Sequence, residues 1–267
     1  MDPTTPAISQ LAYNPLLAGI LSSALFAVLS SMYLLCLRRM RNISLKSLIP
    51  DSDSNVAVVC PAASKNGNLS KEACMTAEEA MALAEVLQCI GTINKKPGVY
   101  SCTETMRQSG VISLGGLQKN AFTRTLLSQF CPGLKIDISP SCGAEDDEVC
   151  ISYGSKSITP TPESSIAFII YLSESTTRCE NSALLIFGQY GIDTVAAARY
   201  VRTRARQLYY DFRGRDFVVQ IETHPSLGYQ GFPKRHQNIS TEVFASQVSQ
   251  PRRRPLTAWR RSTAKGF

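Results

Sequence analysis

Two glycine-containing turns carry the residues whose types and spacing are best suited to chemistry. The first is Leu114–Asn120 (LGGLQKN), which leads from an apolar segment into a helix-like one. Gly115 and Gly116 let the backbone approach a ligand, and the helix start offers free N–H groups and a positive dipole end to an anion. A purely structural interpretation is also open, in which the glycines permit a tight turn and Asn120 caps the helix.

The second turn is Phe187–Thr194 (FGQYGIDT), again between an apolar run and a helix-like segment. Asp193 and Thr194 have the side chains to hydrogen-bond a ribose or a phosphate. In the alternative interpretation, Asp193 is the N-cap of the helix and Gly191 adopts a positive φ. Taking both turns together, we predict a ligand-binding site formed by six residues: Gly115, Gly116, Asn120, Gly188, Gly191 and Thr194.

Catalytic candidates are few. Asp193 and Glu222 are the carboxylates that lie near expected strand ends, and Glu222 shares a strand face with His224. The chain has two histidines, and neither has metal-ligand spacing to a pair of cysteines. The Walker A, G-x-G-x-x-G, G-x-S-x-G and H-E-x-x-H signatures are missing from the sequence. We therefore expect no metal or cofactor, and regard Asp193 and Glu222 as weak catalytic candidates.

Alternating strand-like and helix-like segments must position these turns. The sequence predicts strands over 55–60, 110–114, 134–139, 149–153, 165–172, 182–187 and 216–221, and helices over 75–89, 121–130 and 194–210. Thr76 and Glu79 predict a capping box at the first of these helices. The alternation indicates a mostly parallel, doubly wound α/β sandwich of three layers, flavodoxin- or Rossmann-like, in which ligands bind at the carboxyl ends of strands.

A long apolar segment precedes this domain. Leu16–Leu37 contains 22 residues without a charge, enough for a helix to cross a bilayer. Residues 1–15 carry a single acidic side chain, whereas Arg38, Arg39 and Arg41 follow the apolar run directly. By the positive-inside rule, the short N-terminus is expected outside the cell membrane and the rest in the cytoplasm. Residues 38–54 are predicted to form a basic juxtamembrane linker.

The positive charge is concentrated in the flanks of the chain, which has a net charge of +7. The expected α/β domain, residues 55–224, is almost neutral, whereas residues 225–267 are predicted to be a basic, disordered tail. Arg38, Arg39 and Arg41 suit anionic lipid headgroups, and so do three tail residues: Arg252, Arg253 and Arg254. The tail is equally compatible with nucleic acid or with solvent alone.

Nine cysteines and three N-x-Ser sequons also bear on location. Eight cysteines outside the apolar helix would suit four disulfides in an exported domain. They equally suit a cytosolic domain in which cysteines are small buried hydrophobes. Because the charge asymmetry is the stronger signal, we expect a cytoplasmic domain.

Four segments together resemble a largely uncharacterised family of bacterial α/β domains that often accompany signalling modules or membrane anchors. They are Met75–Leu87, Ile112–Leu127, Ala183–Val201 and Gly214–Glu222, which carry a Gly-Gly-x-x-x-Asn turn, a Gly-x-x-Gly-x-x-Thr turn and an Arg-Asp-Phe strand. Leu117 stands where the family has Pro, and Ile192-Asp193 replaces the usual Gly before Thr194. The resemblance covers about residues 56–222 and implies a flavodoxin- or Rossmann-like ligand-sensing or regulatory module, with no activity attached.

Three functions are compatible with these features. The first is a single-pass membrane protein whose cytosolic domain senses or binds a small anionic ligand, such as a nucleotide. The second is a nucleoside- or nucleotide-processing enzyme of the glycosyl-bond hydrolase or transferase type, with Asp193 or Glu222 as the carboxylate nucleophile. The third is a non-catalytic membrane scaffold. The sequence favours the first.

Overall fold

The chain folds into two compact units, and each is described by itself. The structure, a computed structural model, describes residues 15–50, 55–61, 75–101, 110–115, 120–139, 148–161, 163–177, 182–226 and 236–244. One unit comprises the chain up to Ile43, and the other comprises the chain from Ser44 onward.

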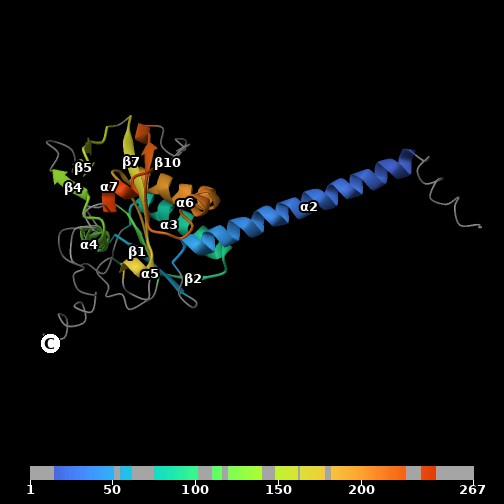
Figure 1. Cartoon of the computed structure of the whole chain (residues 1–267), viewed down its shortest axis with the longest axis horizontal. Helices are drawn as coiled ribbons and strands as arrows, with labels where there is room; N and C mark the ends of the chain where they lie inside the picture. The colour runs from blue at the N-terminus through green and yellow to red at the C-terminus, as the bar shows by residue number, and fades with distance from the viewer. Residues whose placement is uncertain are drawn as a thin grey trace, which may run out of the picture. The chain divides into compact units, whose positions relative to one another are not determined.

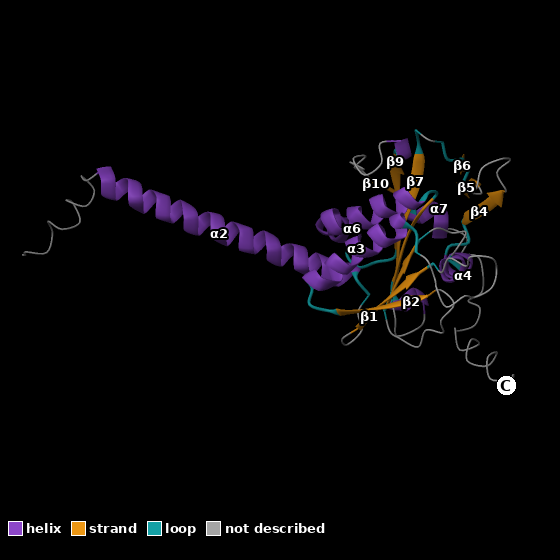
Figure 2. Ribbon diagram, turned by 180° about the vertical axis from the view of Figure 1, so that it is seen from behind, coloured by secondary structure: helices purple, strands orange, loops and turns teal. Residues whose placement is uncertain are grey.

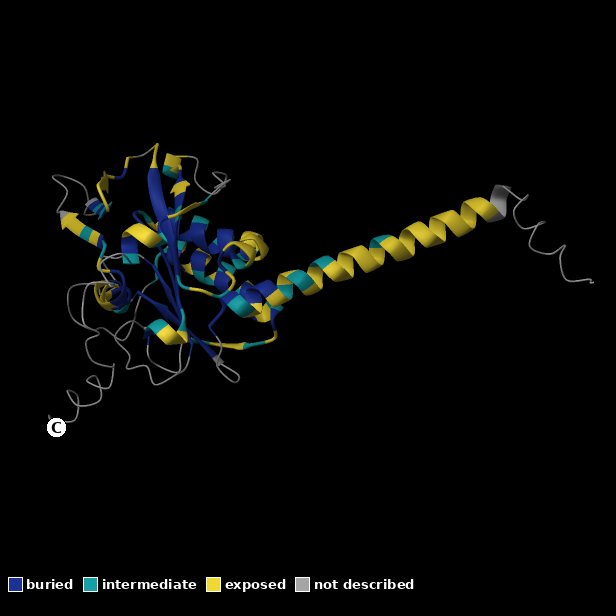
Figure 3. Cartoon of the chain, in the orientation of Figure 1, coloured by how far each residue is buried: buried dark blue, intermediate teal, exposed yellow. Residues whose placement is uncertain are grey.

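The described part of the first unit, residues 15–43, is helical. It belongs to helix α2, which runs over Pro15–Leu48, and the segment Ala18–Leu48 is long and apolar enough to cross a membrane by length and composition. Between Ile20 and Leu35 its large apolar side chains are exposed, and Figure 3 shows this part of the helix mostly in yellow. A helical segment whose apolar side chains are exposed on all sides suits the environment of a bilayer core.

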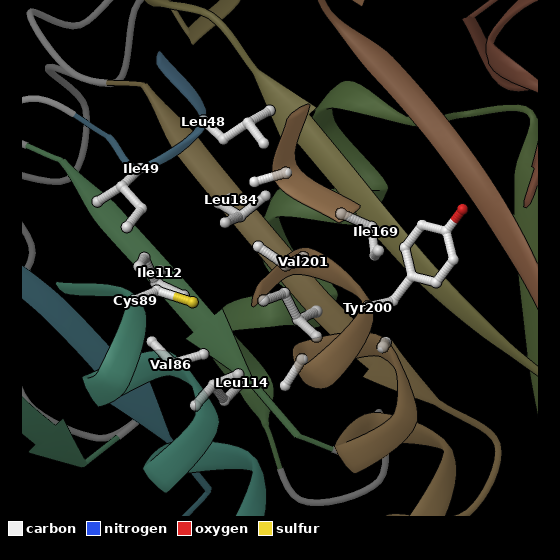
Figure 4. Close-up of a cluster of buried hydrophobic side chains, with 14 of the residues drawn as sticks. Leu48, Ile49, Val86, Cys89, Ile112, Leu114, Ile169, Leu184, Tyr200 and Val201 are labelled. Carbon is white, nitrogen blue, oxygen red and sulfur yellow. The ribbon is translucent and has the colours of Figure 1, made fainter. Parts of the chain in front are cut away.

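The end of α2 differs from the expectation that a polar linker starts soon after Leu37. The helix continues to Leu48, and Leu45, Leu48 and Ile49 are buried in the hydrophobic core of the second unit. Figure 4 shows Leu48 and Ile49 among the buried side chains of this core. Part of the predicted linker is thus a structural element of the α/β domain, because its apolar residues recur at helical spacing.

The second unit is built around a seven-stranded sheet with the order β10-β9-β7-β8-β3-β1-β2. Its strands are β1 (Asn55–Cys60), β2 (Lys96–Ser101), β3 (Val111–Leu114), β7 (Ser165–Leu172), β8 (Ala183–Gly188), β9 (Phe217–Thr223) and β10 (His236–Asn238). The pairs β1–β2, β1–β3 and β3–β8 are parallel, whereas β7 runs antiparallel to both neighbours and β10 antiparallel to β9. Five of the seven strands therefore share one direction, and the sheet is mostly parallel in this sense.

Helices cover one face of the sheet (Figures 1 and 2). The core on this face contains side chains of α3 (Ala77–Thr92), α6 (Gly191–Phe212) and the last turn of α2. The capping box predicted from Thr76 and Glu79 is present at the start of α3. The expected helix at 121–130 is also confirmed, as α4 (Ala121–Phe130), but it lies on the opposite face.

That opposite face is covered by a mixture of helices and strands. Besides α4 it packs against α7 (Ser240–Phe244) and a separate antiparallel sheet of β4 (Leu134–Ser139), β5 (Glu148–Tyr153) and β6 (Lys156–Ile158). The prediction of a mixed α/β unit with a mostly parallel sheet is therefore confirmed, whereas its doubly wound topology is not. In β4, Leu134 and Ile136 alternate with Lys135 and Asp137, which is typical of a strand with one solvent-exposed face. Such a strand does not fit in the interior of a sheet that is covered on both faces.

The central strands β7 and β8 were predicted from their continuous apolar runs, and every residue of both is buried. Phe168 and Phe187 stack across the pair, with ring centroids 5.3 Å apart. Strands covered on both faces need no polar alternation. This pair forms the rigid base beside which the candidate site is built.

Five described elements were not predicted from the sequence: β2, β6, β10, α5 and α7. β2 begins with Lys96-Pro97-Gly98, a pattern that ordinarily breaks strands, but β2 is an edge strand and tolerates a proline. The region after Glu222 was expected to contain little structure, yet β10 and α7 form there. They are held because Ile239 and Val243 are fully buried against the sheet. The short helix α5 (Glu174–Thr177) completes the described elements.

Candidate functional site

The two predicted turns begin next to each other at one edge of the sheet. β3 and β8 are parallel neighbours, so both end at the same edge, with Leu114 paired to Ile186. The N–H of Gly115 donates to the carbonyl of Ile186 at 3.1 Å. The structure thus brings together the turn after β3 and the turn that begins at Gly188. Gly116 lies outside the described residues.

Gly115 has a structural requirement that no other residue type meets. Its φ is 101°, in the region that side chains rarely adopt. A Cβ at this position would lie 2.5 Å from Cγ of Pro61, the residue that follows β1. The close approach of two strand ends therefore demands glycine here.

Asn120 is the N-cap of α4, as predicted, and its side chain is fully buried. Its Oδ1 accepts the N–H of Thr123 at 3.0 Å, and its Nδ2 donates to Ser113 Oγ at 3.1 Å and to the Leu114 carbonyl at 2.7 Å. Both amide hydrogens are used inside the protein. Asn120 therefore fastens the start of α4 to the end of β3.

Gly188 and Gly191 allow α6 to pack closely at its start. A Cβ at Gly188 would lie 2.2 Å from Cβ of Asp193, and one at Gly191 would lie 3.0 Å from Cβ of Glu78. The prediction of a positive φ at Gly191 is wrong, because Gly191 is not among the described glycines with a positive φ. Glu78, in the first turn of α3, therefore lies beside the start of α6. Its negative charge suits the helix dipole and opposes an anion at that point.

Asp193 is the third residue of α6, not its N-cap, which is Tyr190. Its Oδ2 accepts the Tyr190 N–H at 2.8 Å, and its Oδ1 lies 2.7 Å from the hydroxyls of Ser165 and Thr223. Burial raises the pKa of the Asp193 carboxyl, and these hydrogen bonds oppose the shift. With no exposed surface, Asp193 ties α6 to β7 and β9, and it offers no face to a substrate.

Thr194 is the predicted side chain that stays uncommitted. It is 1% exposed, and its Oγ1 has no hydrogen-bond partner within the described part of the chain. Buried hydroxyls are ordinarily paired, and leaving one unpaired costs about 1–3 kcal/mol. Thr194 can therefore accept or donate a hydrogen bond that the described residues do not supply.

The other catalytic candidate, Glu222, is not brought near Asp193. It is exposed on β9, on the face that carries Val218, whereas Thr223 on the opposite face contacts Asp193. His224 is also exposed, and its Nδ1 lies 2.6 Å from the carbonyl of Glu163. The two carboxylates thus face opposite sides of the sheet and cannot act as an acid/base pair on one substrate.

Gln189 is a buried polar residue whose role the sequence did not reveal. Its Oε1 accepts the N–H of Ile166 at 2.9 Å, and its Nε2 donates to the carbonyls of Val149 at 2.9 Å and Ile158 at 3.0 Å. One side chain therefore joins the main sheet to both β5 and β6. The only signal in the sequence is a polar residue directly after an apolar strand.

His236 is a second residue that the sequence did not single out as important. Its Nδ1 lies 2.8 Å from the hydroxyl of Tyr200, and its Nε2 lies 3.2 Å from Oδ2 of Asp211. Burial lowers the pKa of His236, and the neighbouring Asp211 opposes this shift. The contacts fasten β10 to α6, and they engage the hydroxyl of Tyr200 inside the protein.

Within the described ranges, no group of three His, Cys, Asp or Glu side chains is placed to hold a metal ion, and the cysteines there form no disulfide. Comparison of the chain with protein-family models, with curated proteins and with solved structures found no match. Function is therefore inferred from the geometry of this sheet edge and from the apolar helix α2.

Proposed function

We propose that the chain is a single-pass membrane protein whose α/β domain binds a small anionic ligand, such as a nucleotide, in a regulatory role. The observation that carries this proposal is the arrangement around β3. The helices that follow β1 and β8 pack on one face of the sheet, whereas the helix that follows β3 packs on the other. In open α/β sheets such a reversal separates the chain at the carboxyl edge and creates the crevice in which ligands bind.

The ligand contacts in this proposal come mainly from the backbone. The turn from Gly115 leads to the start of α4, where the first N–H groups of the helix are directed toward an anion. Because Glu78 adds negative charge at the start of α6, the anionic group lies on the α4 side of the crevice. The Thr194 hydroxyl adds a hydrogen bond, and Asn120 positions the turn without touching the ligand.

The proposal contains no catalytic step. A glycosyl-transfer reaction needs a carboxylate that reaches the substrate, whereas Asp193 is buried and Glu222 lies on the opposite face of the sheet. A binding role is therefore favoured over the enzymatic alternative.

The membrane part of the proposal places the domain in the cytoplasm and the N-terminus outside. Arg38, Arg39 and Arg41 are exposed on α2 just after the apolar segment, and Lys46 is exposed one turn further on. Basic residues on one side of a span favour the cytoplasmic side. Each contributes about 1 kcal/mol of attraction when close to anionic lipid. The tail arginines Arg252, Arg253 and Arg254 lie outside the described residues.

The ligand is tested with the full chain in lipid nanodiscs, by native mass spectrometry and by thermal shift with a panel of nucleotides. Thr194→Val removes the uncommitted hydroxyl and keeps the shape of the side chain. We expect it to weaken binding about 2- to 10-fold, the range for a hydrogen bond to an uncharged group of the ligand. Thr203→Val is the matched control on α6, because that hydroxyl bonds only to backbone carbonyls of its own helix.

Failure to detect any ligand would favour the scaffold function, and equal affinities of Thr194→Val and wild type would remove Thr194 from the site. Orientation is tested separately with a membrane-impermeant maleimide, since Cys150 is partly exposed on β5. We expect Cys150 to react only after cell lysis, with Cys150→Ser as the control. Reaction in intact cells would reverse the topology.

A further inference from the structure

Three oxygen atoms meet in a closed triangle at the start of α6. Oδ1 of Asp193 lies 2.7 Å from Ser165 Oγ and 2.7 Å from Thr223 Oγ1, and these two hydroxyl oxygens lie 2.8 Å from each other. All three side chains are buried, with exposed fractions of 3% or less. We call Asp193, Ser165 and Thr223 the oxygen triad. It joins α6, β7 and β9.

The number of protons in the oxygen triad decides its charge. Each of the three oxygen–oxygen contacts has the length of an O–H···O hydrogen bond, so three protons are needed. The two hydroxyls supply two, and an ionised carboxylate supplies none. With only two protons, two of the three oxygens would lie at hydrogen-bond distance from each other with no hydrogen between them. With a protonated carboxyl, each oxygen donates once and accepts once around the triangle.

The direction of the contacts supports the same count. If both hydroxyls donated to Oδ1, they would approach it from nearly the same side, because they lie as close to each other as to the carboxyl. Two donors on one carboxylate oxygen ordinarily arrive along separate lone-pair directions. A ring of donors avoids this crowding.

Other groups around Asp193 act in both directions. The Tyr190 N–H and the positive end of the α6 dipole favour the ionised form. Complete burial favours the neutral form, and Glu78 on α3 lies beside Gly191, two residues before Asp193.

The remaining charged side chains near the triad lie outside it. Glu163 precedes β7 and is exposed, and Glu222 and His224 are exposed on either side of Thr223. On α6 the next charged residue after Asp193 is Arg199, which is paired with Glu85 of α3. Among the described residues, no cation contacts the triad to compensate an ionised carboxyl.

We propose that Asp193 is protonated in the folded domain at pH values where an ordinary aspartate is ionised, so that the oxygen triad is a neutral, proton-dependent clamp at the start of α6. Loss of this proton loosens the Gly188–Thr194 turn from β7 and β9. This clamp forms without a ligand at the sheet edge. It makes the Gly188–Thr194 turn sensitive to pH.

The sign of the effect on stability follows from linkage. Because the folded domain holds a proton that the unfolded chain releases near pH 4, the clamp contributes its full stability below that pH. The contribution is lost as pH rises toward the pKa of Asp193 in the folded state, which burial raises. For one proton, the folding equilibrium constant changes at most about tenfold per pH unit in this window.

Asp193→Asn is the sharpest test, because the neutral amide keeps the size of the side chain, its NH₂ can donate to a hydroxyl oxygen of the triad, and its carbonyl accepts the Tyr190 N–H. We expect the full chain with this change, studied in nanodiscs, to keep the free energy of unfolding of wild type. Between about pH 4 and the pKa of Asp193 in the folded state, that free energy should no longer depend on the titration of residue 193. His236 adds a dependence of opposite sign, so the quantity measured is the difference between wild type and variant. Asp137→Asn, an exposed residue on β4, is the control that should leave the pH profile unchanged.

Infrared difference spectroscopy gives the direct readout. At pH 6, about two units above the ordinary value for aspartate, the wild type minus Asp193→Asn spectrum should contain a protonated-carboxyl band. The corresponding spectrum for Asp137→Asn is the reference for a solvent-exposed aspartate.

Thr223→Val covers the case in which Asp193→Asn does not fold. With one hydroxyl fewer, the remaining contact needs one proton, which Ser165 supplies, so the protonated-carboxyl band should vanish at a lower pH than in wild type. Carboxylate bands for Asp193 at pH 6, or equal titration of Thr223→Val and wild type, would overturn the proposal.

Discussion

Replacing Asn120 tests whether this residue holds the sheet edge together before any ligand arrives. Asn120→Ala removes the helix cap, which contributes about 1 kcal/mol. It also removes two further hydrogen bonds of about 1 kcal/mol each, to Ser113 Oγ and the Leu114 carbonyl. We therefore expect the free energy of unfolding to fall by about 3 kcal/mol in the ligand-free protein. The measurement is denaturant unfolding of the full chain in nanodiscs, followed by circular dichroism.

Asn120→Asp separates the cap from the other two bonds. Aspartate caps helices as well as asparagine does, and its charge suits the helix start. However, it places an acceptor 2.7 Å from the acceptor oxygen of Leu114, so we expect a loss of at least about 1–3 kcal/mol. Thr125→Ala is the control on α4, because that exposed hydroxyl bonds only to Ala121, and we expect a change within about 0.5 kcal/mol.

Two results would refute this reasoning. Wild-type stability of Asn120→Asp would mean that the bonds to Ser113 and Leu114 contribute nothing and that Asn120 is only a cap. Wild-type stability of Asn120→Ala in the ligand-free protein, together with lost ligand binding, would return Asn120 to the ligand-contacting role predicted from the sequence.

Two further predictions concern the residues that join separate elements. Gln189→Ala removes three hydrogen bonds, two of which join the main sheet to β5 and β6, so we expect a loss of about 2–4 kcal/mol and faster amide exchange in β5 and β6 than in β7; equal protection of all three strands would contradict this role. The pKa of His236 is lowered by burial, so the stability that depends on its neutral form is present above about pH 6.5 and is lost as pH falls below that value. We expect His236→Gln to reduce this loss in denaturant unfolding at a series of pH values, and an unchanged profile would show that Asp211 compensates the buried charge fully.

The local elements of this protein could largely be predicted from its sequence. The apolar runs of β7 and β8, the capping box of α3 and the N-cap at Asn120 each depend on neighbours a few residues away. Periodicity and capping describe such short-range geometry directly. The uncharged run of α2 likewise predicts a helix able to span a membrane from composition alone.

The tertiary structure determined which elements pack together and which polar side chains are already hydrogen-bonded within the protein. The sequence does not indicate that β7 runs against its neighbours or that β4–β6 form their own sheet, because strand direction depends on pairing between distant segments. For the same reason the sequence offered Asp193 as a cap or a catalyst. Its actual partners, Ser165 and Thr223, lie 28 and 30 residues away in the chain. A side chain is freed or committed by contacts that form only after the chain has folded back on itself, so Thr194 emerges from the structure as the uncommitted residue of the predicted site.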